Sequence, residues 1–229
     1  MTDTVFKKLF ALPDEITQSD IFREAMTHRS AAKKNNERLE FLGDAVLGLT
    51  MSRILFERFP ECDEGDLSRL RAHLVCKRAL TEIATDHKLS EVILLGAGER
   101  KTGGHKRDSI LADAVEAAIA AVYRLKDFDY AFDFVQRIYA EQLQNLPDTQ
   151  SLKDPKTRLQ EYLQGLQIAV PAYETLSERG EANDKTFHIE CKIAKLNLRT
   201  ESEGKSKKKA EQAAAALMIE QLHSEASGK

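Results

Sequence analysis

Three acidic residues share one side of a predicted helix near the start of the chain. Glu37, Glu40 and Asp44 are spaced i, i+3 and i+7, and a helical period places these positions on one face. Like charges at this spacing destabilise an isolated helix by ~0.2–0.5 kcal/mol per pair. A divalent cation between the carboxylates would remove that repulsion, whereas a solvated polar stripe is the simpler alternative for a single acidic face.

A second pair of acidic residues lies on a strongly apolar predicted helix. Asp113 and Glu116 are spaced i and i+3, and the sequence between Ser109 and Tyr123 contains no lysine or arginine to pair with them. Carboxylates are costly to bury on such a helix unless they are paired or bind a metal. If the two acidic helices cross, their carboxylates form a nest that suits Mg²⁺ or Mn²⁺. Such ions activate water and neutralise charge at phosphorus, so the two pairs together favour phosphodiester hydrolysis over a solvated stripe.

The helices that must position these acids belong to a predicted all-helical first domain, residues 1–146. Residues 147–154 contain Pro147 and mainly polar side chains, and Pro155 follows them, a composition typical of a linker. The second domain is predicted over residues 155–225. The apolar residues that recur at helical spacing in the first domain are Leu39, Leu42, Val46 and Leu49, then Ile110, Leu111, Val115, Ile119 and Val122.

The second domain changes its hydrophobic period along the chain. Asp154 and Pro155 are typical of a helix N-cap followed by proline at the first helical position. Residues 187–193 alternate apolar and polar side chains, which predicts a half-buried strand. A weaker strand is predicted at 173–177, another begins near Leu198, and a final helix covers about 206–221. The predicted order is therefore helix, three antiparallel strands, helix.

Composition limits the class of protein. The chain has 229 residues, of which 42% are hydrophobic, so it can form a real core. Three scattered cysteines form no CxxC pair, which argues against a disulfide framework and a zinc knuckle. We expect neither a secretory signal nor a membrane-spanning segment, because no apolar run approaches ~20 residues. A cytoplasmic location, with no membrane partner, is therefore predicted.

The net charge of −3 gives no sign of a polyanionic partner, but its distribution does. Four lysines, Lys205, Lys207, Lys208 and Lys209, gather at the predicted start of the last helix. A helix N-terminus favours anions rather than lysines, so this cluster is unfavourable unless a phosphate meets both the dipole and the ammonium groups. A solvated lysine run is the alternative for the cluster taken alone.

The acidic stretches resemble a known family. The segment NERLEFLGDAV, residues 36–46, is similar to the signature of bacterial ribonuclease III without a break, and RDSILAD at 107–113 followed by Glu116 and Ala117 agrees with it. The resemblance covers nearly the whole chain. It implies an all-α N-terminal nuclease domain and a C-terminal α+β (αβββα) double-stranded-RNA-binding domain.

The resemblance also implies roles for individual residues. It assigns metal binding to Glu40, Asp44, Asp113 and Glu116, with Asp44 and Glu116 as catalytic residues and Mg²⁺ as the cofactor, Mn²⁺ being a plausible substitute. Glu37 and Glu64 match acids near the family's site and are predicted to be secondary. The resemblance further implies a homodimer through the nuclease domain, with the duplex between the protomers and one strand cut by each.

In the second domain, the resemblance implies contacts with double-stranded RNA. Gln160 and Glu161 match residues that reach the RNA minor groove, and Gln164 lies on the same polar helix face. Asn183 stands where the family often has histidine, and we expect its amide to retain a minor-groove contact. At the start of the last helix, Lys205, Lys207 and Lys208 are predicted to bind the backbone.

These patterns predict a Mg²⁺-dependent endoribonuclease of double-stranded RNA. By resemblance, its substrates are ribosomal and other structured precursors, including messenger and transfer RNA. Two alternatives remain open at this point. One is a non-catalytic RNA binder that uses the helical domain only to dimerise, and the other is a metal-dependent phosphohydrolase of small molecules.

Overall fold

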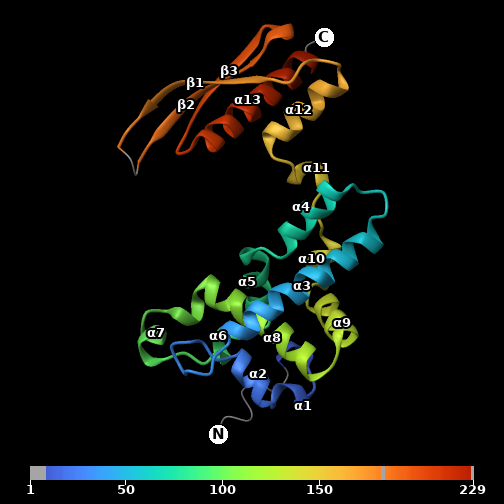
Figure 1. Ribbon diagram of the computed structural model, residues 1–229, viewed down its shortest axis with the longest axis vertical. Coiled ribbons are helices and arrows are strands. Elements are labelled where there is room, and N and C mark those ends of the chain that lie inside the picture. Colours follow the sequence, from blue (N-terminus) through green and yellow to red (C-terminus); the bar gives the residue numbers. More distant parts are fainter. Residues whose placement is uncertain (1–8, 182–183, 228–229) are drawn as a thin grey trace. The chain divides into compact units, whose positions relative to one another are not determined.

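The chain folds into two units, Met1–Pro147 and Asp148–Lys229 (Figure 1). The computed structural model describes residues 9–181 and 184–227. The first unit is helical and the second combines helices with a three-stranded sheet, as the sequence predicts. Each unit has its own core and is described separately.

Helix α8 (Asp108–Leu125) forms the centre of the first unit. Between Ile110 and Val122 every residue is buried except Asp113 and Glu116. Alanine favours helix, and the many alanines of α8 have small side chains that let neighbouring helices approach closely. Helix α3 (Glu37–Arg58) makes the most extensive contact with α8, and α5 (Lys77–Asp86), α9 (Phe128–Ile138) and α2 (Asp20–Ala25) also pack on it.

Shorter elements complete the first unit. They are η1 (Leu9–Ala11), α1 (Asp14–Thr17), α4 (Glu64–Leu74), α6 (Leu89–Val92), α7 (Ala97–Lys101), η2 (Gly104–Lys106) and α10 (Ala140–Gln144). The predicted linker contains a further short helix, α11 (Thr149–Leu152), in which the Ser151 hydroxyl donates to the Asp148 carbonyl. A four-residue helix is too short to produce a periodic apolar signal, which explains why the sequence does not indicate it.

The second unit packs two helices on one face of an antiparallel sheet (Figure 1). The sheet has the order β1–β2–β3, formed by β1 (Ala172–Arg179), β2 (Thr186–Ile193) and β3 (Leu198–Gly204). Between β2 and β3 lies η3 (Ala194–Leu196), and the two helices are α12 (Pro155–Gly165) and α13 (Lys207–Ser227). The core joins Leu159 and Leu163 of α12 to Cys191 and Ile193 of β2 and to Ala214, Ala215, Met218 and Leu222 of α13.

Candidate functional site

Helices α3 and α8 approach each other very closely at Gly43. A Cβ atom at this position would lie 1.8 Å from the carbonyl oxygen of Glu116. That distance is far below any van der Waals contact, so only glycine permits this crossing. The crossing sets the first two turns of α3, which carry acidic residues, beside the middle of α8.

Three carboxylates converge at this crossing. Glu40, Asp113 and Glu116 each offer an oxygen atom, and these three atoms lie within 4.8 Å of one another. We call these three residues the carboxylate cluster. Asp44, the fourth predicted ligand, lies one turn further along α3 and is exposed. It is outside the cluster, but its charge acts on both Glu40 and Glu116.

Burial and mutual repulsion raise the pKa values of the cluster. The pKa of Glu116 rises to about 8, first because of burial and then because of the charges on Asp44, Glu40 and Asp113. Burial also raises the pKa of Glu40, followed by the effect of Asp113. The pKa of Asp113 is raised by burial, although the positive charge of Lys77 opposes the change. The nearby positive charges therefore do not fully offset burial and repulsion in the cluster.

The donor chemistry of the cluster fits a divalent cation. All its groups are carboxylates, the oxygen ligands that Mg²⁺ and Mn²⁺ prefer. Across the described residues, no ion pair within 4.0 Å involves Glu40, Asp113 or Glu116, whereas other acids of this unit do form such pairs. A cation bound here would supply the missing charge.

A polar cavity of about 270 Å³ adjoins the cluster. Its lining includes Glu40 and Asp113 together with Arg29, Arg107 and Ser109. Arginine binds phosphate oxygens with planar N–H donors. The cavity therefore offers groups for a cation and for a phosphate side by side.

The two secondary acids lie in different places. Glu37, in the first turn of α3, lines the same cavity and pairs with Arg29 at 3.4 Å. Glu64 begins α4, where it accepts a hydrogen bond of 2.7 Å from the Ser68 hydroxyl. Helix α3 separates the two positions in sequence, and its 22 residues span ~33 Å. The single chain therefore brings Glu37, but not Glu64, to the cluster.

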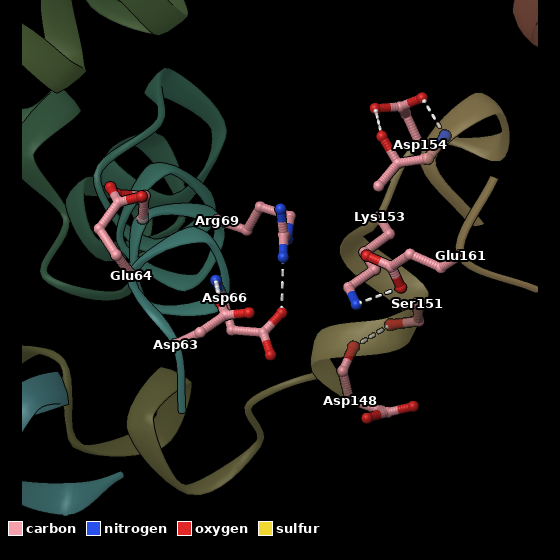
Figure 2. A network of polar contacts seen from close by, with 11 residues as sticks. Asp63, Glu64, Asp66, Arg69, Asp148, Ser151, Lys153, Asp154 and Glu161 are labelled. Carbon is pink, nitrogen blue, oxygen red and sulfur yellow. Dashed lines mark hydrogen bonds and ion pairs between the residues drawn. The ribbon is translucent and has the colours of Figure 1, made fainter. Parts of the chain in front are cut away.

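In the second unit, α12 presents the predicted RNA-contacting side chains on an exposed face. Gln160, Glu161 and Gln164 are all exposed. The helix begins as predicted, because Asp154 accepts a hydrogen bond from the Thr157 amide and Pro155 follows the cap. Figure 2 shows Lys153 pointing to Glu161, with Nζ 2.6 Å from Oε2.

The lysines at the start of α13 differ in their surroundings. Lys205 forms a 2.6 Å ion pair with Asp184, and the Nζ of Lys207 lies 5.9 Å from the centre of the Phe187 ring. Lys208 is exposed in the first turn of α13. Asn183 lies outside the described residues. The structure therefore places an exposed basic group at a helix N-terminus, as the sequence predicts.

Sequence reasoning missed two residues that shape these sites. Gly43 is an isolated glycine inside a helical pattern, which is a recognised signal of a packing constraint, but the pattern does not reveal the partner. Lys153 lies in the predicted linker and carries no local signal of burial. Its ion pair depends on how α11 leads into α12.

The fold and the sites define a class of protein, a helical nuclease joined to a double-stranded-RNA-binding domain. Family models agree with both halves. A model described as ribonuclease-III-like matches residues 18–143, and one described as a double-stranded RNA binding motif matches residues 155–222. The chain belongs to the ribonuclease III family.

Relatives of similar length support this membership. The chain is 48% identical to Ribonuclease 3 of Glaesserella parasuis serovar 5 (strain SH0165), over 89% of this chain and 91% of that protein. It is also 48% identical to Ribonuclease 3 of Shewanella sp. (strain W3-18-1), over 91% of this chain and 92% of that protein. Both alignments span the two units.

Solved structures match the first unit. The nuclease domain of ribonuclease III from Campylobacter jejuni superposes with a TM-score of 0.57 at 36% identity, covering 64% of this chain and all of that one. A second structure of that domain gives a TM-score of 0.54 at 39% identity, covering 57% of this chain and 94% of that one. It is described as showing flexibility in a region involved in dimer formation.

Membership with both domains makes the chain an endoribonuclease of double-stranded RNA. The predicted fold class, an all-α nuclease domain followed by an αβββα RNA-binding domain, is confirmed. Within the described residues, no helix has the length and hydropathy needed to cross a membrane.

Proposed function

We propose that the chain hydrolyses phosphodiester bonds of double-stranded RNA with Mg²⁺ held by Glu40, Asp44, Asp113 and Glu116. The convergence of three carboxylate oxygens within 4.8 Å carries this proposal. Mn²⁺ satisfies the same oxygen ligands and is the expected substitute. When bound, the cation neutralises charge at phosphorus and lowers the pKa of water.

The residues of the chain have distinct roles in this proposal. Glu40, Asp113 and Glu116 hold the cation from the two crossing helices, and a bound cation would oppose the burial and repulsion that raise the pKa of Glu116. Asp44 and Glu116 are the catalytic residues, and exposed Asp44 orients the attacking water at the solvent side. Arg29 and Arg107 contact phosphate from the adjoining cavity, and Glu37 holds Arg29 in place.

The second unit recruits the duplex without taking part in the chemistry. Gln160, Glu161 and Gln164 face the minor groove, where 2′-hydroxyls distinguish RNA. Lys205, Lys207 and Lys208 bind phosphates beside the N-terminus of α13. Asn183 is proposed to add a contact from the loop between β1 and β2.

We also propose that the nuclease units form a homodimer through α3. Phe41, Leu49 and Phe56 are 80%, 59% and 71% exposed, an unusual exposure for large apolar side chains on one helix. A second copy would cover them. Such a dimer would carry two carboxylate clusters, one for each strand of a duplex, and Glu64 is proposed as a secondary acid outside the cluster.

The proposed substrates are ribosomal and other structured RNA precursors, including messenger and transfer RNA, in the cytoplasm. A separate duplex-binding unit supports long base-paired substrates rather than small phosphate esters.

Cleavage assays test the proposal directly. A long perfect RNA duplex should be cut with Mg²⁺ and remain intact in chelator, while single-stranded RNA and an RNA–DNA hybrid should resist cutting. Duplex binding without cleavage under any divalent ion would contradict the proposed chemistry and leave a non-catalytic binder.

The variant Glu116→Gln separates chemistry from recruitment. Removing partners of metal ligands costs about 10–100-fold, so loss of a ligand itself should lower cleavage at least ~100-fold. Duplex binding should stay within about twofold of the parent, because the RNA-binding unit is unchanged. Equal loss of binding and cleavage would contradict the division of labour between the units.

A further inference from the structure

Lys153 is a buried charge beside the proposed RNA-binding face. Among the described residues it is the only lysine, arginine, aspartate or glutamate in the buried class, and its side chain is 6% exposed. Its Nζ lies 2.6 Å from Oε2 of Glu161, whose side chain is 45% exposed. A buried ammonium is costly without a partner, so the lysine holds the glutamate in one place.

The backbone on the far side of Lys153 is fixed by the folded unit. The next residue, Asp154, caps α12 and accepts a 2.6 Å hydrogen bond from the Gln212 side chain of α13. The Gln212 amide oxygen in turn accepts from the Lys156 backbone N–H at 3.0 Å. The position of the ammonium is therefore set by the contact between α12 and α13 rather than by a free linker.

This ion pair constrains what Glu161 can recognise. A carboxylate only accepts hydrogen bonds, whereas a ribose 2′-hydroxyl can donate one and a phosphate cannot. Holding the carboxylate in one rotamer removes the entropy of ordering a long side chain. The ammonium also offsets the repulsion between the carboxylate and the anionic backbone. A fixed, half-exposed Glu161 is thus suited to a hydroxyl donor.

We propose that Lys153 is a positioning residue that fixes Glu161 for recognition of ribose 2′-hydroxyls. The proposal rests on the proposed contact between α12 and the RNA minor groove. It assigns Lys153 a role in selectivity for RNA that acts through Glu161, without contact between Lys153 and RNA.

The test compares the affinities of the full chain for two duplexes, measured in chelator. One is an RNA duplex, and the other is the same duplex with 2′-fluoro riboses, which keeps A-form geometry but lacks the hydroxyl donor. The parent should bind the RNA duplex more tightly than the 2′-fluoro duplex. Lys153→Met should lower this ratio, the affinity for RNA divided by the affinity for the 2′-fluoro duplex, about tenfold, which is the effect of one hydrogen bond to a charged group. Lys153→Arg should restore most of the ratio.

Lys156→Met is the matched control. Lys156 lies three residues after Lys153 but pairs with Glu211 at 2.8 Å. Loss of the Lys156 charge should therefore change the affinities for both duplexes by the same factor and leave their ratio unaltered. A double-mutant cycle completes the design. In a Glu161→Ala background, which has no acceptor at this position, Lys153→Met should have no further effect on the ratio.

Two results would overturn the proposal in different ways. If Lys153→Met lowers both affinities equally, as the control does, the ion pair serves only stability or general attraction. If Glu161→Ala, which removes the acceptor oxygens, leaves the ratio of the parent unchanged, the minor-groove role of Glu161 is wrong and the positioning role falls with it. Thermal unfolding of each variant identifies any loss of folded protein.

Discussion

At Glu116, protonation and cation binding compete for the same carboxylate. Its pKa is raised from 4.5 to about 8, first by burial and then by neighbouring acids. Between these two pH values the folded state retains a proton that the unfolded state has released. The free energy of unfolding must therefore fall as pH rises through this window, and a bound cation would offset that loss.

The resulting prediction concerns stability in chelator. The apparent melting temperature of the metal-free protein should fall between pH 5.5 and about 8, and added Mg²⁺ should recover most of the loss at the alkaline end. Glu116→Gln should flatten the pH dependence, because its amide does not titrate. Identical pH profiles for the parent and this variant would show that Glu116 is not the titrating group.

At the scale of the element, the crossing of α3 and α8 depends on one glycine. Alanine favours a helix interior over glycine by ~1 kcal/mol. Gly43→Ala should nevertheless destabilise the protein and reduce cleavage, because its Cβ would meet the Glu116 carbonyl at 1.8 Å and push the cluster apart. Thermal unfolding and the RNA cleavage rate measure the two effects.

Gly48→Ala is the matched control on the same helix. Apart from the neighbouring backbone of α3 itself, no atom of the described residues lies within 4 Å of a Cβ at that position, so the propensity gain should appear as a stabilisation of up to ~1 kcal/mol. Equal effects of the two alanine substitutions on stability and cleavage would show that the close approach of α3 and α8 at Gly43 does not determine the geometry of the carboxylate cluster.

The same crossing shows how far the sequence could predict the structure. Helical spacing placed Glu40 with Asp44 and Asp113 with Glu116, because the period of a helix is local. Which oxygens converge depends on the crossing at Gly43, which is a tertiary contact that periodicity does not contain. Leu49 illustrates the same limit, since it continues the apolar period but is 59% exposed.

The start of α13 carries a prediction about salt. Neutralising one phosphate contributes ~0.9 to the slope of log affinity against log salt for a duplex. Lys208→Ala should therefore reduce the slope for RNA duplex binding by about 1. Lys205→Ala should reduce it less, because Lys205 is already paired with Asp184 at 2.6 Å. Titrations at several salt concentrations measure both slopes, and equal reductions would contradict a distinction based on that ion pair.

For the whole molecule, the proposed dimer predicts a change in mass rather than in fold. Phe41 and Phe56 remain 80% and 71% exposed in the single chain, so a charge at Phe56 costs a monomer little but would be buried unpaired in a dimer. Phe56→Glu should therefore give particles near 25.8 kDa, while the parent has twice that mass.

Light scattering after size exclusion measures these masses, and circular dichroism confirms that the helices persist. Leu125→Glu is the matched control, since Leu125 is a large apolar residue at the end of α8, outside the α3 surface, and is 37% exposed. It should retain the dimeric mass. The Phe56→Glu variant should keep the carboxylate cluster of each chain intact, because Phe56 lies more than four turns from Glu40 along α3. Monomers that still cut both strands of a duplex at the parent's rate would separate the chemistry from dimerisation and contradict a duplex held between two protomers.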